Sequence, residues 1–302
     1  RIPPPRVSQM KNLPAKVALA PTALVAFVVF VGCIAWTVGL SFTGSRSIPE
    51  LSFVGFDQYV TLFGSPRWIV SMRNMAIFGV GFVGGCLVLG YLLAIFIDQK
   101  VRAESALRTV FLYPYALSYI VTGFAWQWFL NPQLGLQKFM QDLGWTDFTF
   151  RLLIDRNLAI YTIVAAAIWH GAGLVMALVL AGLRGVDEDI WKAINIEGIP
   201  KWRAYLSIIL PMLGPSFATC ILLLAFGVIR NYDLVVAMTG GGPGSATEVP
   251  AKFVMDYLFE RQNVGLASAG ATILILTVVA VAAPIWYARH WQNRRASAAT
   301  KG

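Results

Sequence analysis

The side chains that could bind a polar ligand are few, and they lie within or beside long apolar stretches of the sequence. These candidates are Tyr115, Tyr119, Trp169, His170, Gly171 and Asn231. Aromatic rings offer flat faces to the CH surfaces of a sugar, and hydroxyl, imidazole and amide groups offer hydrogen bonds to its hydroxyls. Tyr115 and Tyr119 would share one face of a helix because they are one turn apart. The set is therefore suited to binding a polar ligand.

No arrangement typical of catalysis accompanies this set. No nucleophile has a base nearby in the sequence, and Cys33, Cys86 and Cys220 lie in apolar stretches, as small core residues do. The glycine run 240–244 lacks the Lys-Ser/Thr that follows the glycines of a phosphate-binding loop. We expect no catalytic residue, no metal site and no cofactor bound by this chain.

The composition is that of an integral membrane protein. Of the 302 residues, 57% are hydrophobic and only 13% are charged, and the mean hydropathy is +0.66. A soluble domain carries about 25% charged residues, so half of the usual polar surface is missing. These values exclude a disordered chain, a coiled coil and a secreted disulfide scaffold.

Six segments are long and apolar enough to cross a bilayer, whose core of about 30 Å needs roughly 20 residues of helix. They are Val17–Leu40, Ile69–Ile97, Leu107–Phe129, Leu158–Leu183, Tyr205–Ile229 and Val264–Ala288. The first is longer than the apolar region of a signal peptide, and we expect it to remain as a span. Only helices satisfy the backbone in lipid over such lengths, so the sequence predicts an all-α membrane protein with six transmembrane helices.

The distribution of charge predicts the orientation. One set of flanks holds 15 basic and 6 acidic residues, a net of +9, whereas the opposite flanks hold 9 of each. The positive side faces the cytoplasm, which places both tails, 1–16 and 289–302, inside. The pI near 9.6 then follows from topology, and we expect no binding to nucleic acid.

The longest inward loop, 184–204, has the pattern of a short amphipathic helix. Asp187 is a predicted N-cap that places acidic residues in the first turn, and Gly198 is the predicted end of the helix. Ile190, Ala193, Ile194 and Glu197 are expected to line one face of this helix. Pro200 prevents continuation, and Pro211 is expected to kink the next span. An interfacial helix that only anchors the loop is the simpler alternative.

Four motifs in this chain resemble those of one transporter family. Lys192-Ala-Ile-Asn-Ile-Glu-Gly198 with Ile209-Leu-Pro211 resembles the "EAA" loop of permease subunits of binding-protein-dependent ABC importers, but Lys192 and Ile194 depart from that pattern. The outward loop around Met238-Thr-Gly-Gly-Gly-Pro-Gly244 resembles the carbohydrate branch of the family. So do Phe53-Val-Gly-Phe-Asp-Gln-Tyr59 and Tyr113-Pro-Tyr-Ala116. The permeases of glucose/mannose uptake are the most similar.

The resemblance implies the type I ABC importer permease fold, with a first helix at 17–40 and a core of five helices over 69–288. It implies a bacterial cytoplasmic (inner) membrane location, a second homologous permease subunit, an external sugar-binding protein, and two cytoplasmic ATPase subunits that hold ATP and Mg²⁺. In the loop 184–204, it implies ATPase coupling by Asp187, Glu188, Lys192, Ala193, Glu197 and Gly198, with Pro211 beyond it. By resemblance to the maltose permease subunit, positions 115, 119, 170, 171 and 231 would contact the sugar. A glucose- or mannose-type monosaccharide is favoured, with an α-glucoside or other oligosaccharide next.

Each candidate also has a simpler explanation. Tyr and Trp are enriched at membrane interfaces, and glycines such as Gly171 permit close helix packing. Arg230 and Asp233 are three residues apart, and we expect them to pair with each other.

An intramembrane enzyme would need paired carboxylates or histidines at cytoplasmic depth, which the sequence does not show. A self-contained secondary sugar transporter is the main alternative; it predicts buried ionisable residues and an inverted repeat.

Overall fold

The computed structural model describes the backbone of residues 13–50, 52–99 and 101–299, and within these the side chains of residues 18–283. All regular secondary structure in this part of the chain is helical, with one isolated antiparallel bridge between Thr43 and Phe53. The predicted tails, 1–16 and 289–302, are only partly included in the described residues. Residues 1–12 and 300–302 lie outside the described residues, and the last helix continues through Ala299, beyond the predicted end of the sixth span.

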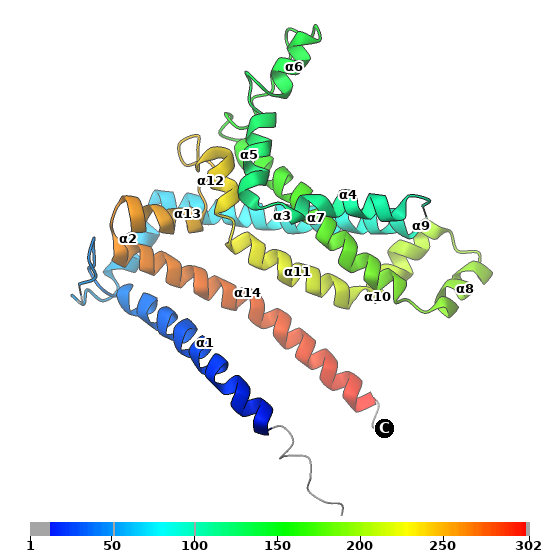
Figure 1. Cartoon of the computed structure of the whole chain (residues 1–302), viewed down its shortest axis with the longest axis horizontal. Helices are drawn as coiled ribbons and strands as arrows, with labels where there is room; N and C mark the ends of the chain where they lie inside the picture. Colours follow the sequence, from blue (N-terminus) through cyan, green and yellow to red (C-terminus); the bar gives the residue numbers. More distant parts are fainter. Residues whose placement is uncertain (1–12, 51, 100, 300–302) are drawn as a thin grey trace, which may run out of the picture.

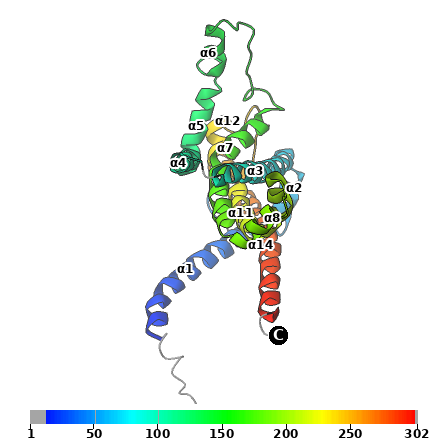
Figure 2. The ribbon, with the colours of Figure 1, turned by 90° about the vertical axis from the view of Figure 1, so that its right-hand side faces the viewer.

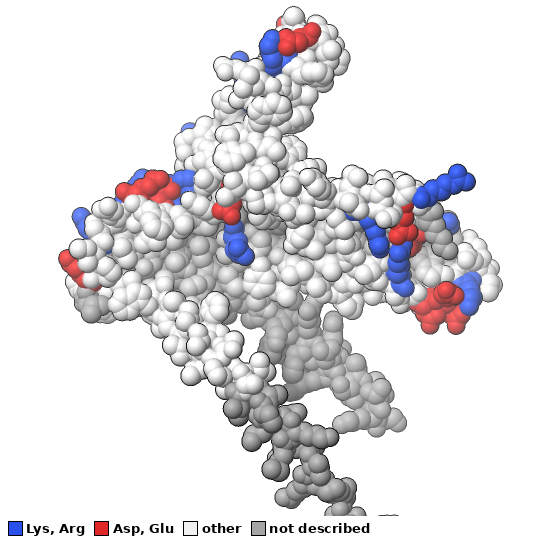
Figure 3. All heavy atoms as spheres, in the orientation of Figure 1, with Lys and Arg blue, Asp and Glu red and all other residues white. Residues whose placement is uncertain are grey.

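Four single helices are long and apolar enough to cross a membrane. They are α1 (Leu13–Leu40), α3 (Pro66–Asp98), α7 (Ala159–Arg184) and α14 (Val264–Ala299). They confirm four of the six predicted segments as helices. Figure 3 shows most charged side chains of this face at its left and right ends and at the tip of the arm that carries α6, whereas the stretch between is mostly uncharged apart from an acidic and a basic group near its middle. This distribution is the one that a bilayer requires, because a charge at the bilayer centre is costly.

The predicted third span, 107–129, is not one helix. It forms α4 (Glu104–Ala116) and α5 (Tyr119–Phe129), separated by Leu117 and Ser118 in extended conformation, with ψ of 151° and 153°. Pro114 cannot donate a backbone hydrogen bond, and the Ser118 hydroxyl accepts one from the Val121 amide, which caps a new helix. The count of six continuous transmembrane helices is therefore not confirmed.

The second helix of this pair leaves the bundle. Figures 1 and 2 show α4 lying along α3 and α7, whereas α5 turns away and leads to α6 (Leu136–Asp142) at the tip of a projecting arm. The break at Leu117 and Ser118 thus redirects the chain and opens space at its base.

The predicted fifth span is bent, as Pro211 led us to expect. It runs through α9 (Lys201–Arg203), a π-helical stretch (Ala204–Ile209) and α10 (Leu210–Met212) into α11 (Gly214–Ile229), with a bend of 72°. The ring of Pro211 excludes a normal hydrogen bond to the preceding turn, and the helix widens there instead. This bent pair would make a fifth membrane crossing.

Short helices complete the end of the bundle at which α3 begins. They are α2 (Asp57–Gly64), α12 (Asp233–Thr239), α13 (Pro250–Met255) and the π-helical stretch Asp256–Glu260, which precedes α14. The remaining short helix, α8 (Glu188–Ile196), lies at the opposite end, beside α9 (Figure 1).

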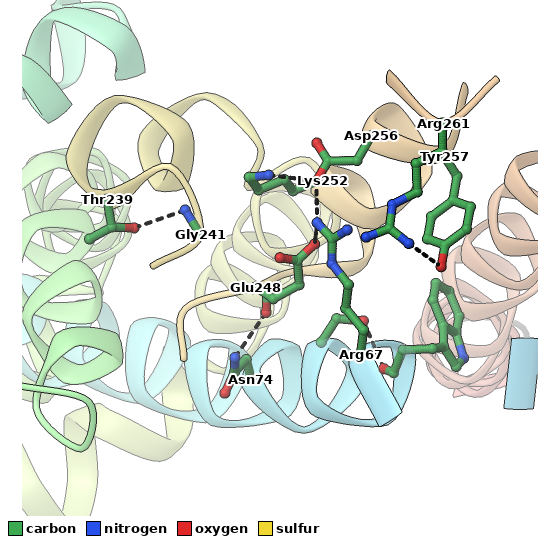
Figure 4. A network of polar contacts seen from close by, with 11 residues as sticks. Arg67, Asn74, Thr239, Gly241, Glu248, Lys252, Asp256, Tyr257 and Arg261 are labelled. Carbon is green, nitrogen blue, oxygen red and sulfur yellow. Dashed lines mark hydrogen bonds and ion pairs between the residues drawn. The ribbon is translucent and has the colours of Figure 1, made fainter. Parts of the chain in front are cut away.

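A group of ion pairs, here called the outer clamp, fixes the loop after α12 to the start of α3 (Figure 4). Arg67 donates to Glu248 at 2.8 Å and also pairs with Asp256, to which Lys252 donates at 2.7 Å. Asn74 donates to the backbone carbonyl of Glu248 at 2.9 Å. Burial raises the pKa of the Glu248 carboxyl, and Arg67 partly offsets this. The outer clamp therefore joins three separate segments through buried or half-buried charges.

Helices α3 and α7 form the centre of the bundle, and glycines let them approach closely. A Cβ atom at Gly90 would lie 2.6 Å from the Val175 Cβ and 3.0 Å from the Ala172 carbonyl oxygen. Small residues at such crossings allow the backbones of membrane helices to come together. Gly84, on the same helix, has no atom within 4 Å of that position.

These two glycines make a matched pair for a stability test. Gly84→Ala should leave the protein unchanged or stabilise it by up to about 1 kcal/mol, since alanine is the better helix former. Gly90→Ala should destabilise it by about 1–3 kcal/mol, because α7 must move away. Thermal unfolding in one detergent would measure both variants. A Gly90→Ala protein as stable as Gly84→Ala would contradict the close packing.

Candidate functional site

A cavity of about 490 Å³ lies in the middle of the bundle, where α4 and α5 separate beside α7 and α11. Its aromatic lining residues are Phe82, Tyr115, Tyr119 and Phe226, and its polar ones are Ser118, His170, Arg230 and Asp233. Tyr115 ends α4 and Tyr119 begins α5, so the break places these two rings on different helices rather than on one helix face. The cavity combines ring faces with hydrogen-bonding groups of both charges.

His170 contacts residues of two other helices at the cavity wall. Its side chain is buried, with its ring centroid 4.3 Å from that of Tyr119 and 5.5 Å from that of Tyr115. Its Nδ1 lies 3.4 Å from the Thr122 hydroxyl. Gly171 leaves space for Phe82, since a Cβ there would lie 3.0 Å from that ring. The imidazole is thus fixed between two tyrosines at the cavity edge.

The structure brings together four of the six candidate binding residues. Tyr115, Tyr119, His170 and Gly171 all line the cavity. Trp169 does not line it, and instead packs edge-on against Trp126 with ring centroids 6.0 Å apart. Asn231 is buried outside the lining, and its amide nitrogen has no hydrogen-bond partner in the structure.

The expected pairing of Arg230 with Asp233 is wrong. Both side chains line the cavity, and within the described residues no ion pair joins them. The reason is that α11 ends before Arg230 and α12 begins at Asp233. Between them the chain makes a tight turn, in which the Tyr232 amide donates a hydrogen bond to the Arg230 carbonyl at 2.8 Å. Helical spacing does not apply across this turn.

Three of the aromatic and polar lining residues were not predicted from the sequence. Phe82 and Phe226 have no pattern that separates them from ordinary core phenylalanines. Ser118 could have been found, because a serine shortly after Pro114 is typical of a helix break followed by a new N-cap.

The loop 184–204 forms the predicted short helix, α8, with both predicted caps. The Asp187 carboxylate accepts from the Asp189 amide at 2.9 Å. Gly198 has φ of +64°, its amide donates to the Asn195 carbonyl, and the Ile199 amide donates to the Ile194 carbonyl. This is a Schellman ending, which favours glycine at the left-handed position.

One face of α8 packs on the bundle and the other is free. Ile194 is buried, and Ile190 and Trp191 are half-buried, whereas Ala193 and Glu197 are exposed. The expectation that Ile190, Ala193, Ile194 and Glu197 form one face is therefore wrong in part: packing places Trp191 inside. The exposed face carries Lys192, Ala193 and Glu197 next to Ile196, which is 85% exposed.

Helix α8 is held to the end of α3 through Tyr205. The Trp191 ring packs edge-on against Tyr205 with centroids 5.4 Å apart. The Tyr205 hydroxyl donates to Asp98 at 2.8 Å and accepts from Gln99 at 2.9 Å. The Tyr91 hydroxyl donates to the Tyr205 carbonyl at 2.7 Å. A short helix fixed in this way can transmit a push to the bundle as a rigid body.

Comparison with known proteins identifies the family. Residues 86–295 match the family of inner membrane components of binding-protein-dependent transport systems. The chain belongs to this family. A probable ABC transporter permease protein of Pyrococcus horikoshii is 34% identical over 280 residues, covering 91% of this chain and 96% of that protein. The xylose/arabinose import permease protein of Haloferax volcanii is 28% identical, covering 90% and 86%.

A solved structure confirms the fold. A bacterial ABC transporter involved in the import of the acidic polysaccharide alginate contains a chain that superposes with a TM-score of 0.79. The two sequences are 18% identical, and the superposition covers 94% of this chain and 96% of that chain. The predicted all-α ABC importer permease fold is therefore correct, although its third predicted span is broken.

Proposed function

We propose that this chain is the permease subunit of an ATP-driven importer for a carbohydrate. The observation that carries the proposal is the mid-bundle cavity in which Tyr115, Tyr119 and His170 meet. Aromatic faces pack on the CH surfaces of a sugar ring, and Arg230 and Asp233 can exchange hydrogen bonds with its hydroxyls. The cavity volume of about 490 Å³ is in the range of small-molecule sites. One relative is a xylose/arabinose import permease, and the solved structure with the same fold comes from an alginate importer, which agrees with a carbohydrate.

The favoured substrate is a glucose- or mannose-type monosaccharide, and an α-glucoside or other oligosaccharide is next. This choice follows the likeness of the outward glycine loop to the carbohydrate branch. An external binding protein would deliver the sugar, and a second homologous permease subunit would complete the pathway. Selection among sugars would then be shared with both partners.

The energy would come from two cytoplasmic ATPase subunits that bind ATP and Mg²⁺. In this proposal the exposed face of α8, with Lys192, Ala193, Ile196 and Glu197, contacts one of them. Closure of the ATPase pair pushes α8, and the contacts of Trp191 with Tyr205 pass the motion to α3 and to the bent fifth span. Rocking between two rigid arrangements requires such a stiff connection.

Two cavity variants test the substrate site. Tyr119→Ala and His170→Ala should each lower sugar-stimulated ATPase activity of the reconstituted complex by about tenfold at subsaturating sugar, the loss expected for one hydrogen bond or ring contact. Tyr113→Ala is the matched control, because Tyr113 lies on α4 with an exposed side chain but outside the cavity. Subunit recovery should not change in any of the three.

Unchanged sugar responses in both cavity variants would contradict the cavity assignment. Uptake by the purified chain alone, in liposomes without ATP, would instead favour the self-contained secondary transporter.

A second test addresses α8. Gly198→Val forces a β-branched residue into the left-handed region, whereas the similarly sized Gly198→Asn tolerates it. No atom lies within 4 Å of a Cβ at this position, so backbone strain is the main difference within the chain. We expect Gly198→Val to lower ATP-driven uptake at least about tenfold while Gly198→Asn retains most of it, given a strain of roughly 1–2 kcal/mol that reorients the helix end. Equal uptake by both would argue against coupling through α8.

A further inference from the structure

A second polar cavity lies at the outward ends of α3 and α7, away from the proposed sugar site. Its volume is about 320 Å³, and it lies beside the glycine-rich loop that the outer clamp holds in place. Its lining includes Arg73, Asn74 and Ile77 from α3, Arg156 just before α7, Tyr161 in the first turn of α7, and Ser245 from the loop. No lining residue is acidic.

Neither arginine of this cavity forms an ion pair with a carboxylate in the described part of the chain. Within the described residues, neither Arg73 nor Arg156 has a carboxylate within 4.0 Å. Two acidic residues beside this cavity, one linked to Asn74 and one adjacent to Arg156 in the sequence, make other contacts. Glu248 is bound by Arg67 in the outer clamp, and Asp155 accepts from the amides of Asn157 and Leu158. The cavity therefore holds two positive charges and attracts an anion.

The loop leaves room beside one of these guanidinium groups. Gly244 has φ of +65°, and a Cβ there would lie 3.6 Å from the Arg156 Nη2. Asn74 uses its amide nitrogen to hold the Ala246 and Glu248 carbonyls at 2.9 Å. The floor of the cavity is thus rigid, while the exposed side chains of Arg73 and Arg156 remain available.

The same face becomes apolar toward the membrane centre. Ile77 lies one turn below Arg73, and Val80, a further turn below, is 79% exposed. On α7, Tyr161 is 57% exposed, at the depth where tyrosines mark a membrane interface. A polar pocket with two arginines therefore lies above an exposed apolar strip.

We propose that Arg73 and Arg156 bind the phosphate of an anionic phospholipid in the outer leaflet. Guanidinium groups bind phosphate through paired hydrogen bonds, and the acyl chains would lie along Ile77 and Val80. A free phosphate ion has the same headgroup chemistry but would leave this strip uncovered. The proposal is independent of the sugar that the protein transports.

Native mass spectrometry of the purified full chain, with the subunits that accompany it, tests this proposal. The protein is taken from nanodiscs that contain equal amounts of phosphatidylglycerol and phosphatidylcholine, and the retained lipids are counted. The native protein should retain phosphatidylglycerol preferentially. The double variant Arg73→Gln/Arg156→Gln should lower this retention about tenfold or more, since each basic residue near the surface contributes about a fivefold preference. Arg151→Gln, an exposed outward arginine outside the cavity, is the control and should retain it.

Two further experiments separate a folding defect and the binding of free phosphate from the binding of a lipid. If the double variant does not fold, Arg73→Lys and Arg156→Lys keep the charge and remove the paired hydrogen bonds, and each should retain less phosphatidylglycerol than the native protein. Equal retention by native and variant proteins would overturn the proposal. So would inorganic phosphate that binds to the native protein in phosphatidylcholine nanodiscs and is not displaced by phosphatidylglycerol, since the site would then take free phosphate.

Discussion

A backbone N–H or carbonyl group that lacks a partner in lipid costs several kcal/mol, so a helix in the membrane can be interrupted only where protein covers the break. The described part of this chain has two such interruptions, one at Leu117–Ser118 beside the mid-bundle cavity and one around Pro211, nearer the end of the bundle that holds α9. At the first, the Ser118 side chain replaces part of the missing helical bonding. Helices α7 and α12 cover this first break, because α7 packs on α4 and α12 packs on α5.

The first interruption also creates the site. Because α4 stops and α5 leaves in another direction, the chain opens a cavity whose wall includes the two extended residues themselves. Helix α7 closes the opposite side with His170 and continues for about 21 Å, at 1.5 Å per residue, to Arg184. There Arg184 donates to Glu104 at 2.6 Å, which ties the ends of α7 and α4 together. The cavity wall and the end of the bundle near α8 are thus parts of one stiff pair of helices.

The sequence predicted what depends on local pattern. Long apolar runs predicted the helices α1, α3, α7 and α14, because hydropathy is read from consecutive residues. The caps Asp187 and Gly198 predicted α8, because each cap acts on the neighbouring turn. Two extended residues inside a run of more than twenty do not change its hydropathy, so the break after Pro114 was missed. The neighbours Trp169 and His170 point about 100° apart on one helix, and only the packing of α5 decides which of them reaches the cavity. Phe82 was missed for the same reason.

The outer clamp has a consequence for how the protein is made. Arg67 meets partners that lie 181 and 189 positions later in the chain. During synthesis the first third of the protein enters the membrane well before Glu248 and Asp256 exist. Until they arrive, Arg67 and the outward end of α3 stay hydrated, because a charge without a partner resists burial. A chain cut short before residue 248 would therefore lack both acidic partners of Arg67, and the start of its α3 would stay open to water.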